Sequence, residues 1–306
     1  MRRAVGLLSL LVAALVWPVA PANAGHLTGK SFILVGGAGR AHGDIPWQVL
    51  KEQLKLRGVQ DSSILEFQYA GGDFTPDGSW HPYSGGACEG YSRASMLALR
   101  ALVGGLASAR PDHEVMLVGW DTGGFVVVQA LLLAASGADP AGGWDNVSGA
   151  AAISAPVAGL SGRRAAFYHA AAAAQGCADT SMIQWIEDVA KEPDRYAAME
   201  AKAALVQQAG YKIGTFGNTV DCAFKYISAD VCPKIRGAAP GGPATAELLL
   251  RALDDERPTQ FIKNALWREF NITMDVDGEL ADNHRATLLS TQPMAELADL
   301  VVSQSR

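Results

Sequence analysis

The chain has 306 residues, of which 49% are hydrophobic and 18% are charged. This composition excludes a disordered or low-complexity protein and is sufficient for a sizeable buried core. The formal net charge is −6, and an acidic chain without a basic cluster is a poor candidate for nucleic-acid binding.

The first 24 residues have the pattern of a secretory signal peptide. Arg2 and Arg3 give a basic start, an apolar run follows over 4–17, and 22–24 has the small-x-small form of a cleavage site. The run is too short to span a bilayer, and no other apolar run reaches about 18 residues. We therefore expect residues 25–306 to form a secreted or periplasmic domain without stable membrane insertion.

Strands and helices alternate along the first half of this domain. In chain order the patterns predict a strand at 31–35, a helix at 45–57, a strand at 63–67, a Gly-rich loop at 70–90, a helix at 92–109, a strand at 114–118, a helix at 123–135 and a strand at 147–153. Such alternation is typical of an α/β fold with a mostly parallel central sheet covered by helices on both faces.

The second half begins with an Ala-rich segment at 161–209 that has helical patterns and no strand signal. We interpret it as a helical lid over one end of the sheet; covering helices of the ordinary kind are the alternative. The patterns then predict a strand at 211–216, a Gly/Pro-rich loop at 236–243, helices at 244–254 and 258–270, and a closing amphipathic helix at 293–303.

The four cysteines are expected to be oxidised in an exported protein. They are Cys88, Cys177, Cys222 and Cys232. Our hypothesis pairs Cys222 with Cys232 across a short loop and Cys88 with Cys177 over a longer span. No C-x-x-C motif and no His/Cys cluster with zinc spacing is present, so no metal site is expected.

The segment Gly119-Trp120-Asp121-Thr122-Gly123-Gly124 lies directly between a predicted strand and a predicted helix. Glycines two residues before and two residues after Asp121 permit a sharp turn that exposes the central side chain at the end of the sheet. The backbone N–H groups that follow, at the helix N-terminus, favour negative charge.

In this pattern the chain resembles the α/β-hydrolase superfamily. The G-x-nucleophile-x-G turn is present with its strand and helix, and Leu34-Val35-Gly36-Gly37-Ala38 resembles the strand that leads into the oxyanion loop. The segment 153–159 is similar to the one that follows the next strand in lipase-like members. The resemblance implies an α/β-hydrolase fold and a nucleophile at position 121.

The chain departs from lipases and esterases because Asp121 replaces serine. In this respect it is similar to epoxide hydrolases and haloalkane dehalogenases, in which a carboxylate attacks carbon and forms an alkyl ester. A carboxylate is already ionised and needs no base to activate it. Two alternatives stay open: a lipase-like protein that lost catalysis and only binds, and an acyl-ester hydrolase with an unusual nucleophile.

In this fold the catalytic partners follow in the order nucleophile, acid, histidine. His284 is the histidine downstream of the last predicted strand, in a polar segment that we expect to be a loop. Asp221, soon after the strand at 211–216, is the predicted acid that orients its imidazole. Asp275 and Asp277 are the alternatives.

The resemblance also implies further site residues. The backbone N–H groups of Ala38 and Thr122 are the expected oxyanion donors. Tyr168 and Tyr196, in the predicted lid, are candidates for protonating an epoxide oxygen. The indoles of Trp120 and Trp185 are weaker candidates for binding a released halide.

No cofactor is implied, and the expected substrate is small and apolar or lipid-like. The segment 86–90 also has the form G-x-C-x-G, but no apolar strand precedes it, so Cys88 is not expected to be a nucleophile.

Overall fold

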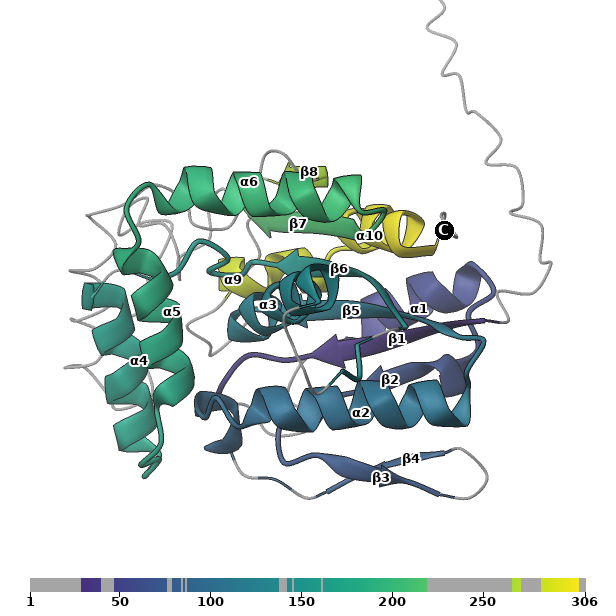
Figure 1. Cartoon of the computed structure of the whole chain (residues 1–306), viewed down its shortest axis with the longest axis horizontal. Helices are drawn as coiled ribbons and strands as arrows, with labels where there is room; N and C mark the ends of the chain where they lie inside the picture. Colours follow the sequence, from purple (N-terminus) through teal and green to yellow (C-terminus); the bar gives the residue numbers. More distant parts are fainter. Residues whose placement is uncertain are drawn as a thin grey trace, which may run out of the picture.

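The computed structural model describes residues 29–39, 47–75, 79–83, 85, 87–137, 142–144, 146–160, 162–218, 266–270 and 282–302. Its centre is a six-stranded parallel sheet with the strand order β2-β1-β5-β6-β7-β8 (Figure 1). These strands are β1 Lys30–Val35, β2 Ile64–Glu66, β5 Glu114–Trp120, β6 Val147–Ile153, β7 Lys212–Asn218 and β8 Leu266–Phe270.

Two groups of helices cover the sheet, one on each face. The helices are α1 Gln48–Leu56, α2 Ser95–Ala109, α3 Thr122–Ser136, α4 Gly162–Ala174, α5 Ser181–Lys191, α6 Arg195–Gln208, α9 Asp282–Leu289 and α10 Thr291–Val302. Side chains of β1 alternate between the two faces. Phe32 and Leu34 join the core with α1 and α10, whereas Ile33 and Val35 join the core with α2 and α3. Because both faces are buried, the central strands are mostly apolar, with a few buried polar residues such as Ser31, Ser148 and Thr215.

The predicted α/β fold, a parallel central sheet covered by helices on both faces, is confirmed in this arrangement. The chain passes from β1 to β2 on one side and then crosses back to β5 on the other side of β1. At such a switch point the loops after neighbouring strands diverge and leave a crevice at their carboxyl ends. The loop after β1 and the turn at Asp121 after β5 both lie at this point.

Three local predictions were wrong. Residues 266–270 lie in a predicted helix but form β8, which extends the sheet by pairing with β7; a short run of this kind carries too weak a periodicity to separate strand from helix. The predicted loop at 70–90 contains a small hairpin, β3 Gly72–Phe74 with β4 Trp80–Pro82. His284 lies in the helix α9 rather than in a loop, because Ala286 and Leu288 of that helix are buried in the core.

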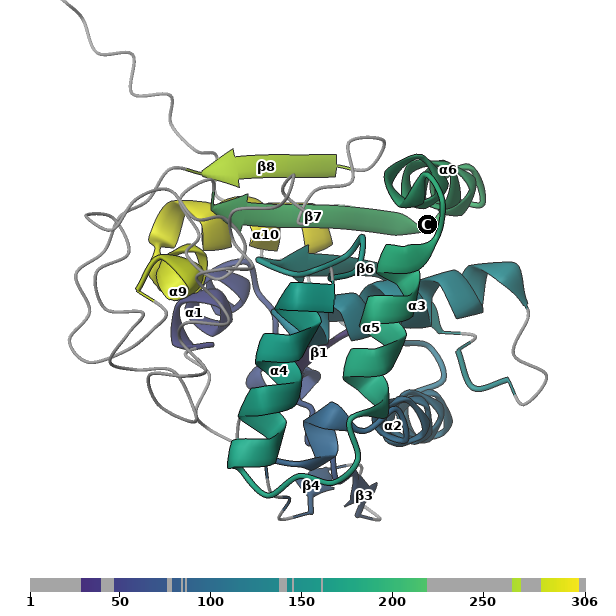
Figure 2. The same cartoon turned by 90° about the vertical axis from the view of Figure 1, so that its left-hand side faces the viewer.

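The segment predicted as a lid forms three helices with two different positions. Figure 2 looks onto the carboxyl end of the sheet and shows α4 and α5 in front of the strand ends. By contrast, α6 packs beside α3 and β7 and covers a face of the sheet. A lid therefore stays a prediction for α4 and α5 and is not supported for α6.

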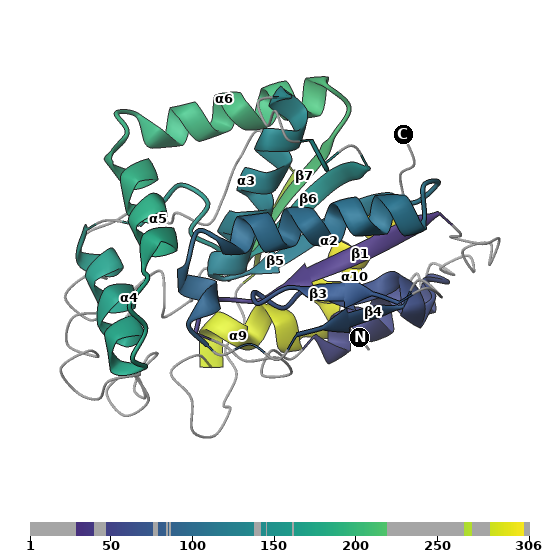
Figure 3. The same ribbon diagram turned by 60° about the horizontal axis from the view of Figure 1, so that its bottom comes forward.

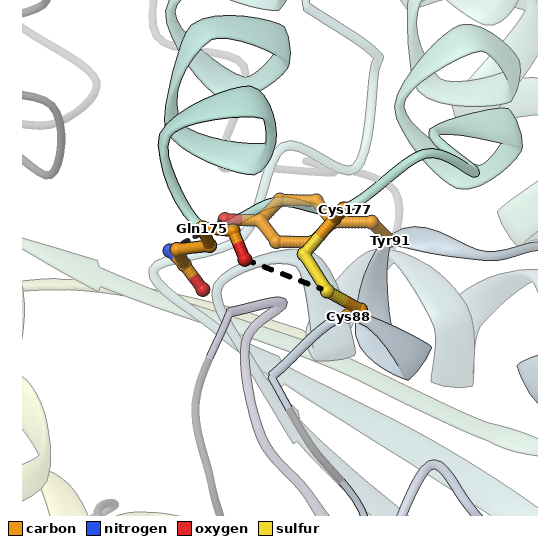
Figure 4. Close-up of a disulfide and its surroundings, with 4 residues drawn as sticks. All are labelled: Cys88, Tyr91, Gln175 and Cys177. Atoms are coloured by element: carbon orange, nitrogen blue, oxygen red, sulfur yellow. Dashed lines mark hydrogen bonds between the residues drawn. A yellow bond between two sulfur atoms is a disulfide. The ribbon is translucent and has the colours of Figure 1, made fainter.

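A disulfide between Cys88 and Cys177 joins the segment before α2 to the connection between α4 and α5 (Figure 4). This is the longer of the two hypothesised links. The side-chain amide of Gln175 also donates a hydrogen bond to the Tyr91 hydroxyl at 3.3 Å. The pair α4–α5 is thus tied to the body of the protein at its outer end. Cys222 and Cys232 lie outside the described residues, as do 1–24, 236–243 and 244–254.

Replacing both Cys88 and Cys177 by serine should lower the free energy of unfolding. The bond closes a span of 89 residues, and removing such a link costs about 2–5 kcal/mol. Urea unfolding of the oxidised wild type and the double variant measures the difference. An unchanged midpoint would show that this disulfide does not stabilise the fold.

Candidate active site

The turn at Asp121 brings the backbone of α3 against the end of β1. Asp121 has φ 56° and ψ −131°, a conformation that costs a non-glycine residue of order 1–3 kcal/mol. A Cβ atom on Gly123 would collide with the carbonyl oxygens of Val35 and Gly36, and one on Gly119 would collide with the backbone of Gly123. The glycine spacing in the sequence is therefore required by this close approach.

The two oxygens of the Asp121 carboxylate have different surroundings. Oδ1 accepts a hydrogen bond of 2.9 Å from the Tyr168 hydroxyl on α4, and His284 Nε2 on α9 lies 3.8 Å from it. Oδ2 faces the loop after β1, where a Cβ atom on Gly37 would lie only 2.5 Å away. The residue is only 8% exposed. Oδ1 therefore faces the candidate acid and base, whereas Oδ2 faces the predicted oxyanion loop.

Trp120 holds His284 in place. Its indole Nε1 donates to the backbone carbonyl of His284 at 3.4 Å, and the two rings lie 4.8 Å apart. Trp120 and His284 are 2% and 5% exposed. Because Trp120 directly precedes Asp121, the same strand end fixes both the carboxylate and the imidazole.

Tyr69 is a site residue that the sequence analysis missed. Its hydroxyl donates a hydrogen bond to the carbonyl of Gly36. Burial, and secondarily the charge of Asp121, raises the pKa of Tyr69 far above its usual value, so the phenol stays protonated. The sequence holds one signal for Tyr69, which is its position three residues after β2. Residues that follow neighbouring parallel strands lie at the same edge of the sheet, so Tyr69 is placed near the turn at Asp121.

One of the two predicted oxyanion donors has a partner within the protein. The backbone N–H of Ala38 donates to the Thr122 side-chain oxygen at 2.5 Å. An anion that uses this donor must displace the Thr122 hydroxyl. Thr122 itself begins α3, so its backbone lies at the positive end of the helix dipole.

Two of the remaining predicted site residues, Tyr196 and Trp185, are described by the structure, and their recorded contacts are with residues other than Asp121. On α6, the Tyr196 hydroxyl accepts a hydrogen bond of 3.2 Å from Arg195. The Trp185 ring packs on Phe125 and beneath the guanidinium of Arg93. Asp221, Asp275 and Asp277 lie outside the described residues.

Within the described ranges, no three His, Cys, Asp or Glu side chains gather in a way that could hold a metal ion. Over the same ranges, no helix is long and apolar enough to cross a membrane. Around Asp121 the described residues place the His284 imidazole and the phenols of Tyr69 and Tyr168, side chains of the kinds that can transfer protons.

Comparison with protein-family models finds no match, and comparison with curated proteins finds none either. Solved structures similar to the chain include phospholipase PlaB from Legionella pneumophila (15% identity, TM-score 0.39), with 62% of this chain and 39% of that protein covered. The chain thus spans well under half of that phospholipase.

Two further similar structures cover most of both chains. One is a lipase-esterase related protein from Clostridium acetobutylicum (12% identity, TM-score 0.39, 88% of this chain and 92% of that one). The other is an enol-lactonase from Burkholderia xenovorans (15% identity, TM-score 0.39, 89% and 91%).

Replacing Gly37 by alanine should destabilise the fold. The new Cβ would lie 2.5 Å from Asp121 Oδ2 and 3.2 Å from its Cγ, and overpacking of this kind costs about 1–3 kcal/mol. Urea unfolding measures the change.

Gly104→Ala in α2 is the matched control, because a Cβ there meets only ordinary contact at 3.9 Å. It should stabilise the helix by about 0.5–1 kcal/mol. Adding Asp121→Ala to Gly37→Ala should recover part of the loss, since it removes Oδ2 and Cγ and leaves only the Cβ of residue 121, at 3.0 Å. If Gly37→Ala and Gly104→Ala changed the free energy of unfolding equally, the close contact between Gly37 and Asp121 would be contradicted.

Proposed function

We propose that this protein is a hydrolase that opens epoxides through a covalent ester on Asp121. The observation that carries the proposal is the position of Asp121: a carboxylate on the turn after β5, with Oδ1 between a phenol and an imidazole. The substrate class follows the sequence analysis and is small and apolar or lipid-like. Export of the protein also remains a prediction.

In the first step, Asp121 Oδ1 attacks one carbon of the epoxide and displaces the ring oxygen. A new C–O ester bond forms, the carbon–oxygen bond of the ring breaks, and the ring oxygen takes the proton of the Tyr168 hydroxyl. The 2.9 Å contact between Tyr168 and Oδ1 supports this role, because an epoxide seated on Oδ1 would bring its oxygen near the same phenol. The Tyr168 phenolate later regains a proton from solvent.

In the second step, water hydrolyses the ester. His284 takes a proton from the water, and the resulting hydroxide adds to Asp121 Cγ. Negative charge develops on Oδ2, which faces Gly37. Asp121 is also the residue that directly precedes α3, and the positive end of a helix dipole favours negative charge. Collapse of this intermediate breaks the bond between Cγ and Oδ1, and the departing alkoxide takes the proton from His284. Asp121, left as a carboxylic acid, releases its proton to solvent, which restores the carboxylate and balances the proton that Tyr168 regained. The net reaction is addition of water to give a vicinal diol, and Asp221 is the predicted partner that orients His284.

The indoles argue against a carbon–halide substrate. A released halide needs N–H donors that point into the site. The N–H of Trp120 is used by the His284 carbonyl, and the recorded ring contacts of Trp185 are with Phe125 and Arg93, not with Asp121. Epoxide opening, which needs a phenol instead, matches the contacts of Oδ1 better.

A second candidate function is binding without catalysis. It is favoured by the hydrogen bond from the Ala38 N–H to Thr122, which occupies a donor that hydrolysis would use. In that case the fold is a lipase-like frame that lost its serine.

The proposal predicts that Asp121→Ala abolishes turnover of styrene oxide and that Tyr168→Phe lowers kcat about 10²-fold, the usual contribution of a general acid. Tyr196→Phe is the matched control, because its hydroxyl pairs with Arg195, and it should keep the wild-type rate. Diol formation followed by chromatography gives these rates. Equal losses in the two tyrosine variants would exclude Tyr168 as the acid.

A single turnover in ¹⁸O-labelled water tests the covalent step. Because water attacks Cγ, the label should enter Asp121 and not the first diol, as mass spectrometry of the diol and of the peptide containing Asp121 would report. Label in the diol would mean direct attack of water on the epoxide. An inert wild type together with an Asp121→Ser variant that cleaves p-nitrophenyl esters would favour the non-catalytic reading.

A further inference from the structure

A pocket of about 460 Å³ lies on the face of the protein covered by α3 and α6, away from Asp121. Figure 3 shows α3, α5 and α6 meeting on this side. The lining residues of α3 are in its second half, from Gln129 to Ser136. Since a helix rises 1.5 Å per residue, Leu132 is about 15 Å along α3 from the turn that carries Asp121. The pocket is thus separate from the candidate active site.

The pocket has an apolar floor and wall. Leu132, Leu133 and Val206 line it, and Trp185 of α5 closes one side. Leu205 also lines it and is 65% exposed, which is unusual for a large aliphatic side chain. Its volume is that of pockets that bind small molecules, and such pockets are mostly apolar with a few placed polar groups.

The charged groups of the lining are both cations. They are Arg93, whose guanidinium lies 4.3 Å from the centre of the Trp185 ring, and Lys202 of α6. None of the ten lining residues is acidic. Lys202 does pair with Glu192 at 3.7 Å, but both side chains are nearly half exposed, and an exposed pair of this kind contributes little. Lys202 is therefore able to exchange this partner for a ligand.

From this combination we infer that the pocket binds a free anionic amphiphile, such as a medium-chain carboxylate. The apolar part packs on the leucines and Trp185, and the anionic group pairs with Arg93 and Lys202. Residues of α3, α5 and α6 line a pocket of limited volume, which fits a single free molecule better than the surface of a membrane. The inference does not depend on the reaction proposed for Asp121.

Binding is tested on the full-length protein with 1-anilinonaphthalene-8-sulfonate, an anionic aromatic probe whose fluorescence rises in apolar sites. We expect one saturable site per chain from which decanoate displaces the probe and decyltrimethylammonium does not. Arg93→Gln should weaken probe binding about tenfold, as loss of a charge-assisted contact does. Lys191→Gln, which removes an exposed α5 lysine outside the lining, should leave it unchanged.

A second pair of variants locates the site. Ala135→Phe fills the pocket and should abolish binding, whereas Ala197→Phe, at an exposed position of α6 outside the lining, should not. Circular dichroism confirms that each variant is folded, and Arg93→Gln, a change at the surface, still decides the question if Ala135→Phe unfolds.

Three results would overturn the inference. They are absence of saturable binding, equal displacement by the cationic amphiphile, and wild-type binding in both Arg93→Gln and Ala135→Phe. Turnover of styrene oxide is measured separately, so failure of either proposal leaves the other standing.

Discussion

The close approach of α3 to the end of β1 is the constraint on which the site depends. Gly123 lies so near the carbonyl oxygens of Val35 and Gly36 that no side chain fits. This contact forces the chain to reverse at Asp121 in a left-handed conformation. The turn presents the carboxylate at the topological switch point of the sheet, where the loops after β1 and β5 separate. Buried apolar packing of β5 and α3 on both sides offsets the strain at Asp121.

Three distant segments of the chain converge on this one carboxylate. Tyr168 comes from α4, His284 from α9 and Gly37 from the loop after β1. Two of these segments have a contact that holds them in place. The disulfide ties α4 at its outer end, and the His284 imidazole of α9 packs against Trp120. The two carboxylate oxygens therefore have different surroundings: Oδ1 lies beside a phenol and an imidazole, whereas Oδ2 lies against a backbone loop.

Helix α3 serves two different regions of the molecule. Its N-terminus shapes the turn at Asp121, while its second half forms the floor of the pocket beside α6. Trp185 touches both regions: it lines the pocket together with Arg93, and its ring packs against Phe125, which lies close to the turn. The two regions carry side chains of opposite charge: the turn carries the carboxylate of Asp121, whereas the pocket is lined by the cations Arg93 and Lys202.

The sequence alone determined the parallel α/β frame, the turn at 119–124 and Asp121 as its central residue. These are local signals: apolar runs of strand length, and glycines at fixed spacing where backbones touch. The Cys88–Cys177 pairing was among the alternatives that it allowed. Only the tertiary structure decided that His284 sits in a buried helix against Trp120, that Tyr168 rather than Tyr196 contacts Asp121, and that 266–270 is a strand. Those features arise from contacts between segments far apart in the chain, and neither periodicity nor propensity within a single segment records them.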